Sequence, residues 1–299
     1  MDNHYTEPVT LGKQPSLMLP AGTALILEGG GTRGFFSAGV LDAFMDAGIM
    51  FPYIVGVSAG AANSLSYVSG QRGRNRLIAE RYVGLPQYLG IRNLLRQRSL
   101  FGFDFVLKTL PQQHVYWDKT LFDEAPVNLL TGAIDCQTGQ TVWFDKQHVQ
   151  QDFDVIRASC SIPLVSPIVE YGGYQLLDGG ISSPISIDKS LADGNRFHVV
   201  ILTRNAGYQK PPLSYPALIK LVYRRYPQLV EAMLNRHQVY QRQLDLVEQL
   251  AAEGKAVIIR PRQPVRLSST SRDVTEILRL HDEGHELGTE ALPQILERV

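Results

Sequence analysis

Cysteine is scarce in this sequence, which has only Cys136 and Cys160 among its 299 residues. The two lie far apart and form neither a disulfide framework nor the spacing of a metal site. This usage fits a reducing compartment, and Cys160, within an apolar run, is expected in the core rather than as a reactive thiol.

An excess of one charge sign is also missing, since 29 basic and 29 acidic residues give a formal net charge of zero. Without a net positive charge, the protein as a whole has no long-range electrostatic attraction for nucleic acid. Nucleic acid is therefore not expected as a partner. With 44% hydrophobic and 19% charged residues, the composition is that of an ordinary globular protein.

Long apolar runs are absent as well. No window approaches the roughly 18 apolar residues of a membrane-spanning helix. The first 20 residues carry no apolar stretch behind a basic start and do not resemble a signal peptide. We therefore expect a cytoplasmic protein that meets any lipid substrate from outside, at the membrane surface.

Apolar segments and helical patterns alternate at the start of the chain. A strand over residues 23–28, a helix from Phe35, a strand over 53–57 and a helix from Ser58 follow one another. This order predicts an α/β fold, a three-layer α/β/α core with a mainly parallel sheet. Further strands are expected at 126–133, 140–144, 168–171, 174–177, 197–203 and 255–260.

Prolines at 211, 212 and 216 mark a junction, after which the pattern is mostly helical. We divide the chain into an N-terminal tail (1–20), a catalytic domain (21–205) and a mostly helical C-terminal extension (206–299).

The segment from Gly56 to Gly60 has the pattern Gly-x-Ser-x-Gly and places Ser58 between a predicted strand and a predicted helix. A nucleophile on such a sharp turn needs small neighbours, because larger side chains would clash there. The alternative is a tight turn in which Ser58 only caps the helix.

The loop from Gly29 to Gly34 also lies between a strand and a helix. Its backbone N–H groups could hold a tetrahedral oxyanion. The same spacing matches the dinucleotide fingerprint, which expects an acidic residue at the end of the second strand. Here that strand ends in Ser58, and the nearest acids, Asp42 and Asp46, fall in the predicted helix, which weakens this alternative.

A third motif, Asp178-Gly179-Gly180, directly follows a predicted strand. An aspartate at this place serves as a general base or as an orienting group, and the alternative is an ordinary turn residue.

Together, the Gly-Gly-Gly-x-Arg-Gly loop, the Gly-x-Ser-x-Gly turn and the distant Asp-Gly-Gly resemble the patatin-like phospholipases, in the same order and each after an apparent strand. The block from Ala158 to Pro163 is similar to a family segment that precedes the aspartate. The resemblance covers residues 24–205, and the C-terminal part is similar to the extension of a bacterial subgroup.

The resemblance implies a serine hydrolase that cleaves acyl esters of lipids or phospholipids through an acyl-enzyme, with no metal or other cofactor. Ser58 would be the nucleophile, flanked by Gly56 and Gly60, and Asp178 the base. Arg33 would shape the loop or attract an anionic head group, and Gly180 stands where many members have alanine. The oxyanion hole would comprise Gly29, Gly30, Gly31, Arg33 and Gly34.

Histidine leaves a second mechanism open. A carboxylesterase triad of the α/β-hydrolase type runs serine, acid, histidine, and Ser58, Asp178 and either His198 or His237 fit that order. Neither histidine falls in a strand-end loop, so the motif order favours a Ser–Asp dyad. A nucleotide-binding module and a catalytically silent interaction protein are the non-enzymatic alternatives.

Two basic and apolar segments, residues 72–101 and 218–226, are candidates for peripheral contact with an anionic membrane. The same pattern is typical of a solvated helix face, so both interpretations stay open.

Overall fold

The computed structural model describes residues 12–13, 15–151 and 153–298, so most of the predicted N-terminal tail lies outside the described residues. Its centre is an eight-stranded sheet in the order β10-β9-β2-β4-β5-β8-β7, with β6 also paired to β5. The parallel part comprises β2 (Thr23–Leu27), β4 (Tyr53–Val57), β5 (Asn128–Asp135), β9 (Phe197–Ile201) and β10 (Ala256–Ile259).

One edge of the sheet is antiparallel. Both β6 (Thr141–Asp145) and β8 (Tyr174–Asp178) run against β5, and β7 (Val169–Tyr171) runs against β8. The turn between β7 and β8 is Gly172-Gly173, with φ of 56° and 83°. Two successive positive φ angles suit glycine and give the tight hairpin that the sequence predicts.

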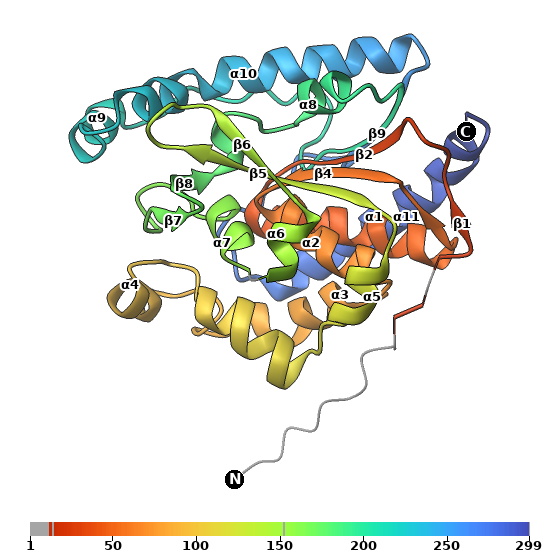
Figure 1. The fold of residues 1–299 in the computed structure, drawn as a ribbon, viewed down its shortest axis with the longest axis horizontal. Helices are drawn as coiled ribbons and strands as arrows, with labels where there is room; N and C mark the ends of the chain where they lie inside the picture. Colours follow the sequence, from red (N-terminus) through yellow and green to blue (C-terminus); the bar gives the residue numbers. More distant parts are fainter. Residues whose placement is uncertain (1–11, 14, 152, 299) are drawn as a thin grey trace.

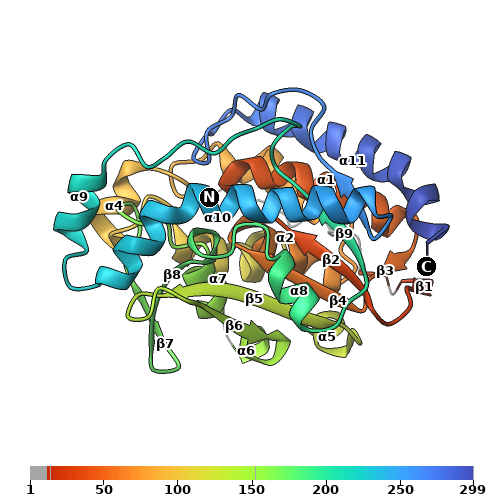
Figure 2. The same ribbon diagram turned by 90° about the horizontal axis from the view of Figure 1, so that it is seen from above.

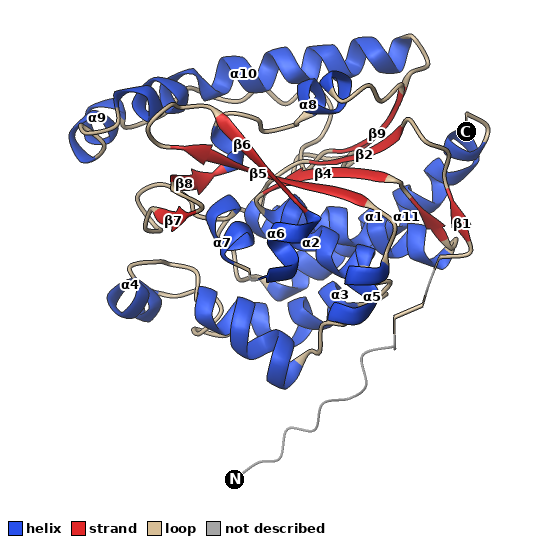
Figure 3. Cartoon of the chain, viewed as in Figure 1, coloured by secondary structure: helices blue, strands red, loops and turns tan. Residues whose placement is uncertain are grey.

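Helices cover both faces of the sheet (Figures 1 and 3). One face carries α8 (Ile187–Ala192) and the long α10 (Pro227–Ala252), which crosses above the sheet in Figure 2. The opposite face carries α1 (Phe35–Asp46), α2 (Ala59–Val68), α7 (Asp154–Ser159) and α11 (Val274–Leu296). The predicted three-layer fold with a mainly parallel sheet and a mostly helical C-terminal part is confirmed.

Short elements complete the fold. They are β1 (Leu17–Met18), β3 (Ile49–Met50), η1 (Gly31–Gly34), α3 (Arg74–Ile78), η2 (Ala79–Val83), α4 (Ile91–Gln97), η3 (Phe105–His114), α5 (Lys119–Glu124), α6 (Lys146–Gln151), η4 (Gly179–Ile181) and α9 (Pro216–Val222). No helix within the described ranges is long and apolar enough to cross a membrane.

The last helix, α11, packs closely against the first, α1. A Cβ atom at Gly284 would lie 2.1 Å from the carbonyl oxygen of Phe36, and one at Gly39 would lie 1.9 Å from that of His281. Only glycine allows the two backbones to approach so closely. The C-terminal part is therefore joined to the preceding residues in two ways. Its strand β10 pairs with β9 of the central sheet, and its helix α11 packs against α1.

Candidate active site

Ser58 lies at a sharp turn between β4 and α2, with φ of 54° and ψ of −127°. A positive φ in a residue with a side chain is strained, and such strain clusters at functional sites. The neighbouring glycines make the turn possible, because a Cβ at Gly60 would lie 2.4 Å from the carbonyl oxygen of Leu27 and one at Gly56 2.9 Å from the nitrogen of Ala61. The turn therefore has the backbone that the sequence predicts for a nucleophile.

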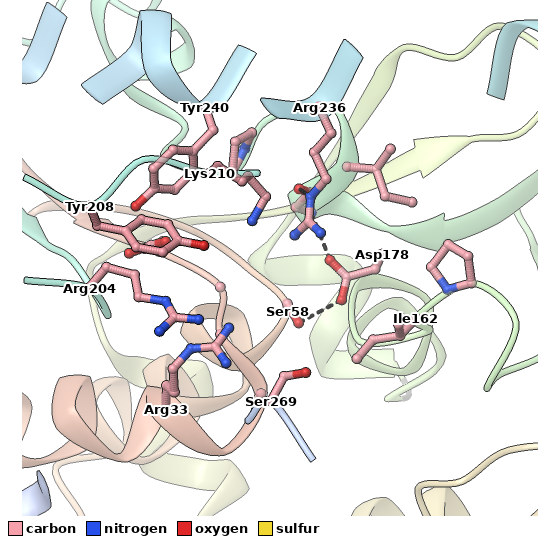
Figure 4. A pocket seen from close by; sticks show the side chains of 18 residues that line it. Arg33, Ser58, Ile162, Asp178, Arg204, Tyr208, Lys210, Arg236, Tyr240 and Ser269 are labelled. Atoms are coloured by element: carbon pink, nitrogen blue, oxygen red, sulfur yellow. Dashed lines mark hydrogen bonds between the residues drawn. The ribbon is translucent and has the colours of Figure 1, made fainter. Parts of the chain in front are cut away.

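The Ser58 hydroxyl donates a hydrogen bond to Oδ2 of Asp178 over 2.7 Å (Figure 4). The sheet brings the two together, because Ser58 follows β4, Asp178 ends β8, and both strands are neighbours of β5. In the register, Val57 lies opposite Gly132 and Asp178 opposite Ala133. Residues distant in sequence thus meet beside Gly132 and Ala133 of the strand that lies between them.

The carboxylate of Asp178 is buried, with 6% of the residue exposed. Its Oδ1 accepts a hydrogen bond from the Gly180 N–H over 2.8 Å. Burial raises the pKa of Asp178, and the Ser58 hydrogen bond and the charge of Arg236 offset only part of that rise. A carboxylate with a raised pKa is a stronger base once it is ionised.

Ser159 stabilises the turn at Ser58 through two hydrogen bonds. Its Oγ accepts from the Ser58 N–H over 2.8 Å and donates to the carbonyl oxygen of Gly132 over 2.6 Å. The sequence marked this block only by its family resemblance. Next to it, Cys160 packs against the core, and burial raises the pKa of its thiol.

The glycine loop lines the pocket beside Ser58, with Gly29, Gly30 and Gly31 facing it. Gly31 has φ of 57°, and a Cβ there would lie 2.1 Å from the Ser269 carbonyl oxygen. Within the described ranges, the N–H groups of these three glycines donate no hydrogen bond to a protein acceptor. They are therefore free to bind a substrate oxygen.

The other two loop residues contribute differently. The backbone N–H of Arg33 donates to Gly30, so Arg33 offers the pocket its side chain. Gly34 accepts a hydrogen bond from Asn63 over 2.7 Å and lines a second, apolar pocket.

That second pocket shares Gly31, Ser58 and Ile162 with the first. Its walls are mainly apolar: Phe35, Tyr88, Phe101, Phe103, Val106, Leu107 and Ile156. The side chain of Ser58 thus sits between a polar space and an apolar one.

Sequence reasoning missed several pocket residues. They come from the chain after β9 and from α10: Arg204, Tyr208, Lys210, Arg236 and Tyr240 (Figure 4). No local motif marks them, because a loop and a helix far along the chain bring them to the site.

The two candidate histidines lie elsewhere. His198 is buried within β9, where its Nδ1 is 3.1 Å from Ser190 Oγ, and burial lowers its pKa to about 4. The Nδ1 of His237 is 3.0 Å from the carbonyl oxygen of Leu234. Among the residues that the structure describes, no histidine lines either pocket at Ser58.

Comparison with known proteins finds several similar chains. YjjU, an uncharacterised protein of Escherichia coli, is 34% identical over 205 residues, covering 66% of this chain and 57% of its own length. An uncharacterised NTE family protein of Mycobacterium bovis is 31% identical over 164 residues, covering 54% of this chain and 43% of its own. This chain thus spans about half the length of these relatives.

Among solved structures, VipD from Legionella pneumophila aligns at a TM-score of 0.45 and 13% identity, over 92% of this chain and 67% of that one. A domain family of unknown function, DUF6363, matches residues 226–299. The profile of the patatin-like phospholipases matches residues 25–189, more than half of the chain and the whole segment that carries Ser58, Asp178 and the glycine loop. The chain therefore belongs to the patatin-like phospholipase family.

Proposed function

We propose that this protein hydrolyses acyl esters of lipids, with Ser58 as the nucleophile and Asp178 as the general base. The observation that carries the proposal is the 2.7 Å hydrogen bond between the Ser58 hydroxyl and the buried carboxylate of Asp178. This geometry suits proton transfer, because the base lies within direct reach of the proton that it removes.

In the first step, Ser58 Oγ would bond to the ester carbonyl carbon while its proton moves to Asp178. The ester C–O bond then breaks, and Asp178 returns the proton to the departing alcohol oxygen. In the second step, water attacks the acyl-enzyme, Asp178 takes the water proton, and the acid leaves as Ser58 regains its hydrogen. No other reactant is needed.

The free N–H groups of Gly29, Gly30 and Gly31 would bind the oxyanion that forms on the carbonyl oxygen. Such donors stabilise a transition state by roughly 3 kcal/mol each. The apolar pocket would take the acyl chain, since its walls exclude water and Ser58 lies at its border. These features favour a fatty acyl ester over a small polar one.

Labelling with a fluorophosphonate probe tests the proposal. We expect labelling of the wild type, none of Ser58→Ala, strongly reduced labelling of Asp178→Asn, and normal labelling of a variant that lacks His198 and His237. The double histidine variant tests the alternative triad. If this variant is not labelled although circular dichroism shows that it is folded, a Ser-Asp-His triad replaces the dyad.

The pH dependence should follow Asp178. Because the base must be ionised, kcat/KM should fall as pH drops through its raised pKa. The charge of Arg236 lowers that pKa, so Arg236→Gln should move the acidic limb to higher pH. The control is Arg242→Gln, an exposed position on the same helix that pairs with Asp188. Identical pH profiles for both variants would contradict the assigned role of Arg236.

We also propose that the enzyme contacts an anionic membrane through α4 and α9. The two helices lie at the same end of the molecule (Figures 1 and 2). Both expose large apolar side chains, including Ile91 at 74%, Leu95 at 83% and Leu221 at 63%. Basic residues accompany them: Arg92, Arg96 and Arg98 at α4, and Lys220, Arg224 and Arg225 at α9. Apolar and basic side chains on one surface suit an anionic bilayer.

Both helices border the candidate site. The α4 segment lies between Leu89 and Phe101, which form a β-bridge, and Phe101 lines the apolar pocket. The hydroxyl of Tyr223, at the end of α9, accepts a hydrogen bond from the Leu164 N–H over 2.9 Å. Leu164 lies two residues after Ile162, which belongs to the pocket wall. Contact through these helices would place the pocket against the lipid surface.

Vesicle sedimentation tests this contact. Leu95→Glu combined with Leu221→Glu should weaken binding to phosphatidylglycerol vesicles by about tenfold or more, since each change removes apolar contact and adds repulsion. Leu191→Glu, at a position on α8 that is 36% exposed, is the control. Equal binding by wild type and the double variant would contradict the membrane assignment.

A further inference from the structure

The polar pocket above Ser58 collects four cationic side chains, Arg33, Arg204, Lys210 and Arg236 (Figure 4). Within the part of the chain that the structure describes, none of these side chains forms a salt bridge, with N···O within 4.0 Å, to a carboxylate. Cations that converge on a pocket without direct ion pairs can bind an anion that comes from outside.

Neutral contacts hold these cations in place. Arg204 donates to the carbonyl oxygen of Val265 over 3.0 Å, and its guanidinium carbon lies 4.5 Å from the ring centre of Tyr208. The Lys210 ammonium lies 5.0 Å from the ring centre of Tyr240. Such contacts fix the positions of the charges without neutralising them.

The four cations also repel one another, which disfavours their charged forms. Burial lowers the pKa of Arg33 to about 10, and the charge of Arg204 adds to that effect. Burial likewise lowers the pKa of Lys210 to about 7, with the charge of Arg236 as the next cause. In addition, Nε of Arg33 is buried without a hydrogen-bond partner. A bound anion would relieve this repulsion.

The pocket contains two carboxylates, Glu28 and Asp178, against four cations. Glu28 accepts a hydrogen bond from the Thr203 N–H over 2.5 Å, and burial raises the pKa of both carboxyl groups. Asp178 already accepts a hydrogen bond from Ser58. The carboxylates therefore leave positive charge in excess beside the nucleophile.

Resting on the proposed function, we infer that this cluster binds a phosphate group on the alcohol side of the substrate ester. The apolar pocket holds the acyl chain, so the departing alcohol faces the cationic pocket on the other side of Ser58. Three guanidinium groups and one ammonium match the several oxygens of a phosphate better than the two of a carboxylate. The favoured substrates are acyl esters of phosphorylated alcohols without a cationic head group.

Three of these four cations, Arg204, Lys210 and Arg236, follow residues 25–189, the segment that matches the family profile. The chain beyond that segment thus has a specific role: it selects the head group.

Kinetics on soluble short-chain esters tests the inference without a membrane. The substrates are monohexanoyl glycerol phosphate, monohexanoyl glycerophosphocholine and monohexanoyl glycerol. We expect the wild type to prefer the phosphate ester over the neutral ester in kcat/KM by about tenfold or more, because charge-assisted hydrogen bonds are strong. The choline ester should be the poorest, since its cation meets the cluster.

Arg204→Gln and Lys210→Gln should each lower the ratio of phosphate to neutral ester by about tenfold. Lys108→Gln, at an exposed site on η3, is the matched control and should keep the wild-type ratio. A ratio near one in the wild type, or one that neither pocket variant changes, overturns the inference while ester hydrolysis itself stands.

A binding arm separates this outcome from failure of the proposed function. If no ester is hydrolysed, the proposed function fails, and calorimetry on Ser58→Ala decides the subsite. Hexyl phosphate should bind more tightly than hexyl phosphocholine, and Lys210→Gln in the same background should remove that difference. Equal affinity for the two ligands, or binding of inorganic phosphate as tight as that of hexyl phosphate, overturns the head-group assignment.

Discussion

Asp178→Asn is expected to lower kcat for a fatty acyl ester by about 10²- to 10⁴-fold, the range associated with loss of a general base. Asparagine keeps the shape of the side chain and can still accept the Gly180 N–H bond, but it cannot take the Ser58 proton. Steady-state kinetics with a chromogenic ester measures the loss.

The stability of the same variant provides the control. Burial raises the pKa of Asp178, so the ionised carboxylate costs folding free energy, and a neutral amide should unfold at the same temperature or higher. Asp145→Asn, at an exposed aspartate, should leave both properties unchanged. A drop in kcat below tenfold would show that Asp178 is not the base.

The second large effect concerns the contact between α1 and α11. His281→Leu should lower the free energy of unfolding by about 3–5 kcal/mol, because removing one partner of a buried pair leaves the other uncompensated. His281 Nε2 lies 3.1 Å from Asp42 Oδ2, and the two residues are only 3% and 2% exposed. The remaining bond to Asp42, from the Gly73 N–H, does not replace the lost partner.

Urea unfolding followed by circular dichroism measures this effect. The matched control is His148→Leu, because His148 forms an exposed pair with Asp145 over 2.8 Å, and such pairs contribute about 0–1 kcal/mol. A loss below about 1 kcal/mol for His281→Leu, similar to the control, would mean that the buried pair does not hold the last helix in place.

The sequence predicts most of the core because its signals are local. Glycines at fixed spacing predict turns at Gly29–Gly34, Gly56–Gly60 and Gly172-Gly173, and the structure has sharp turns at each. Short apolar runs between them located β2, β4 and β9 to within a few residues. Each of these features depends on neighbours in the chain.

The rest of the pocket depends on contacts between distant residues. Arg236 and Tyr240 lie on α10, and only the crossing of that helix over the sheet turns them toward Ser58. Lys210 sits in a proline-rich loop whose path no periodicity predicts. The same holds for the close approach of α1 and α11 at Gly39 and Gly284, because each glycine faces a backbone that is distant in sequence.

We expect Ser58 to carry the acyl group during turnover. Mass spectrometry after rapid mixing with a p-nitrophenyl fatty acyl ester detects this acyl-enzyme. We predict that the wild-type peptide containing Ser58 gains the mass of one acyl group, that the gain decays with continued turnover, and that Ser58→Ala shows neither acylation nor hydrolysis. Full hydrolysis by Ser58→Ala, or acylation at another residue, would contradict this expectation.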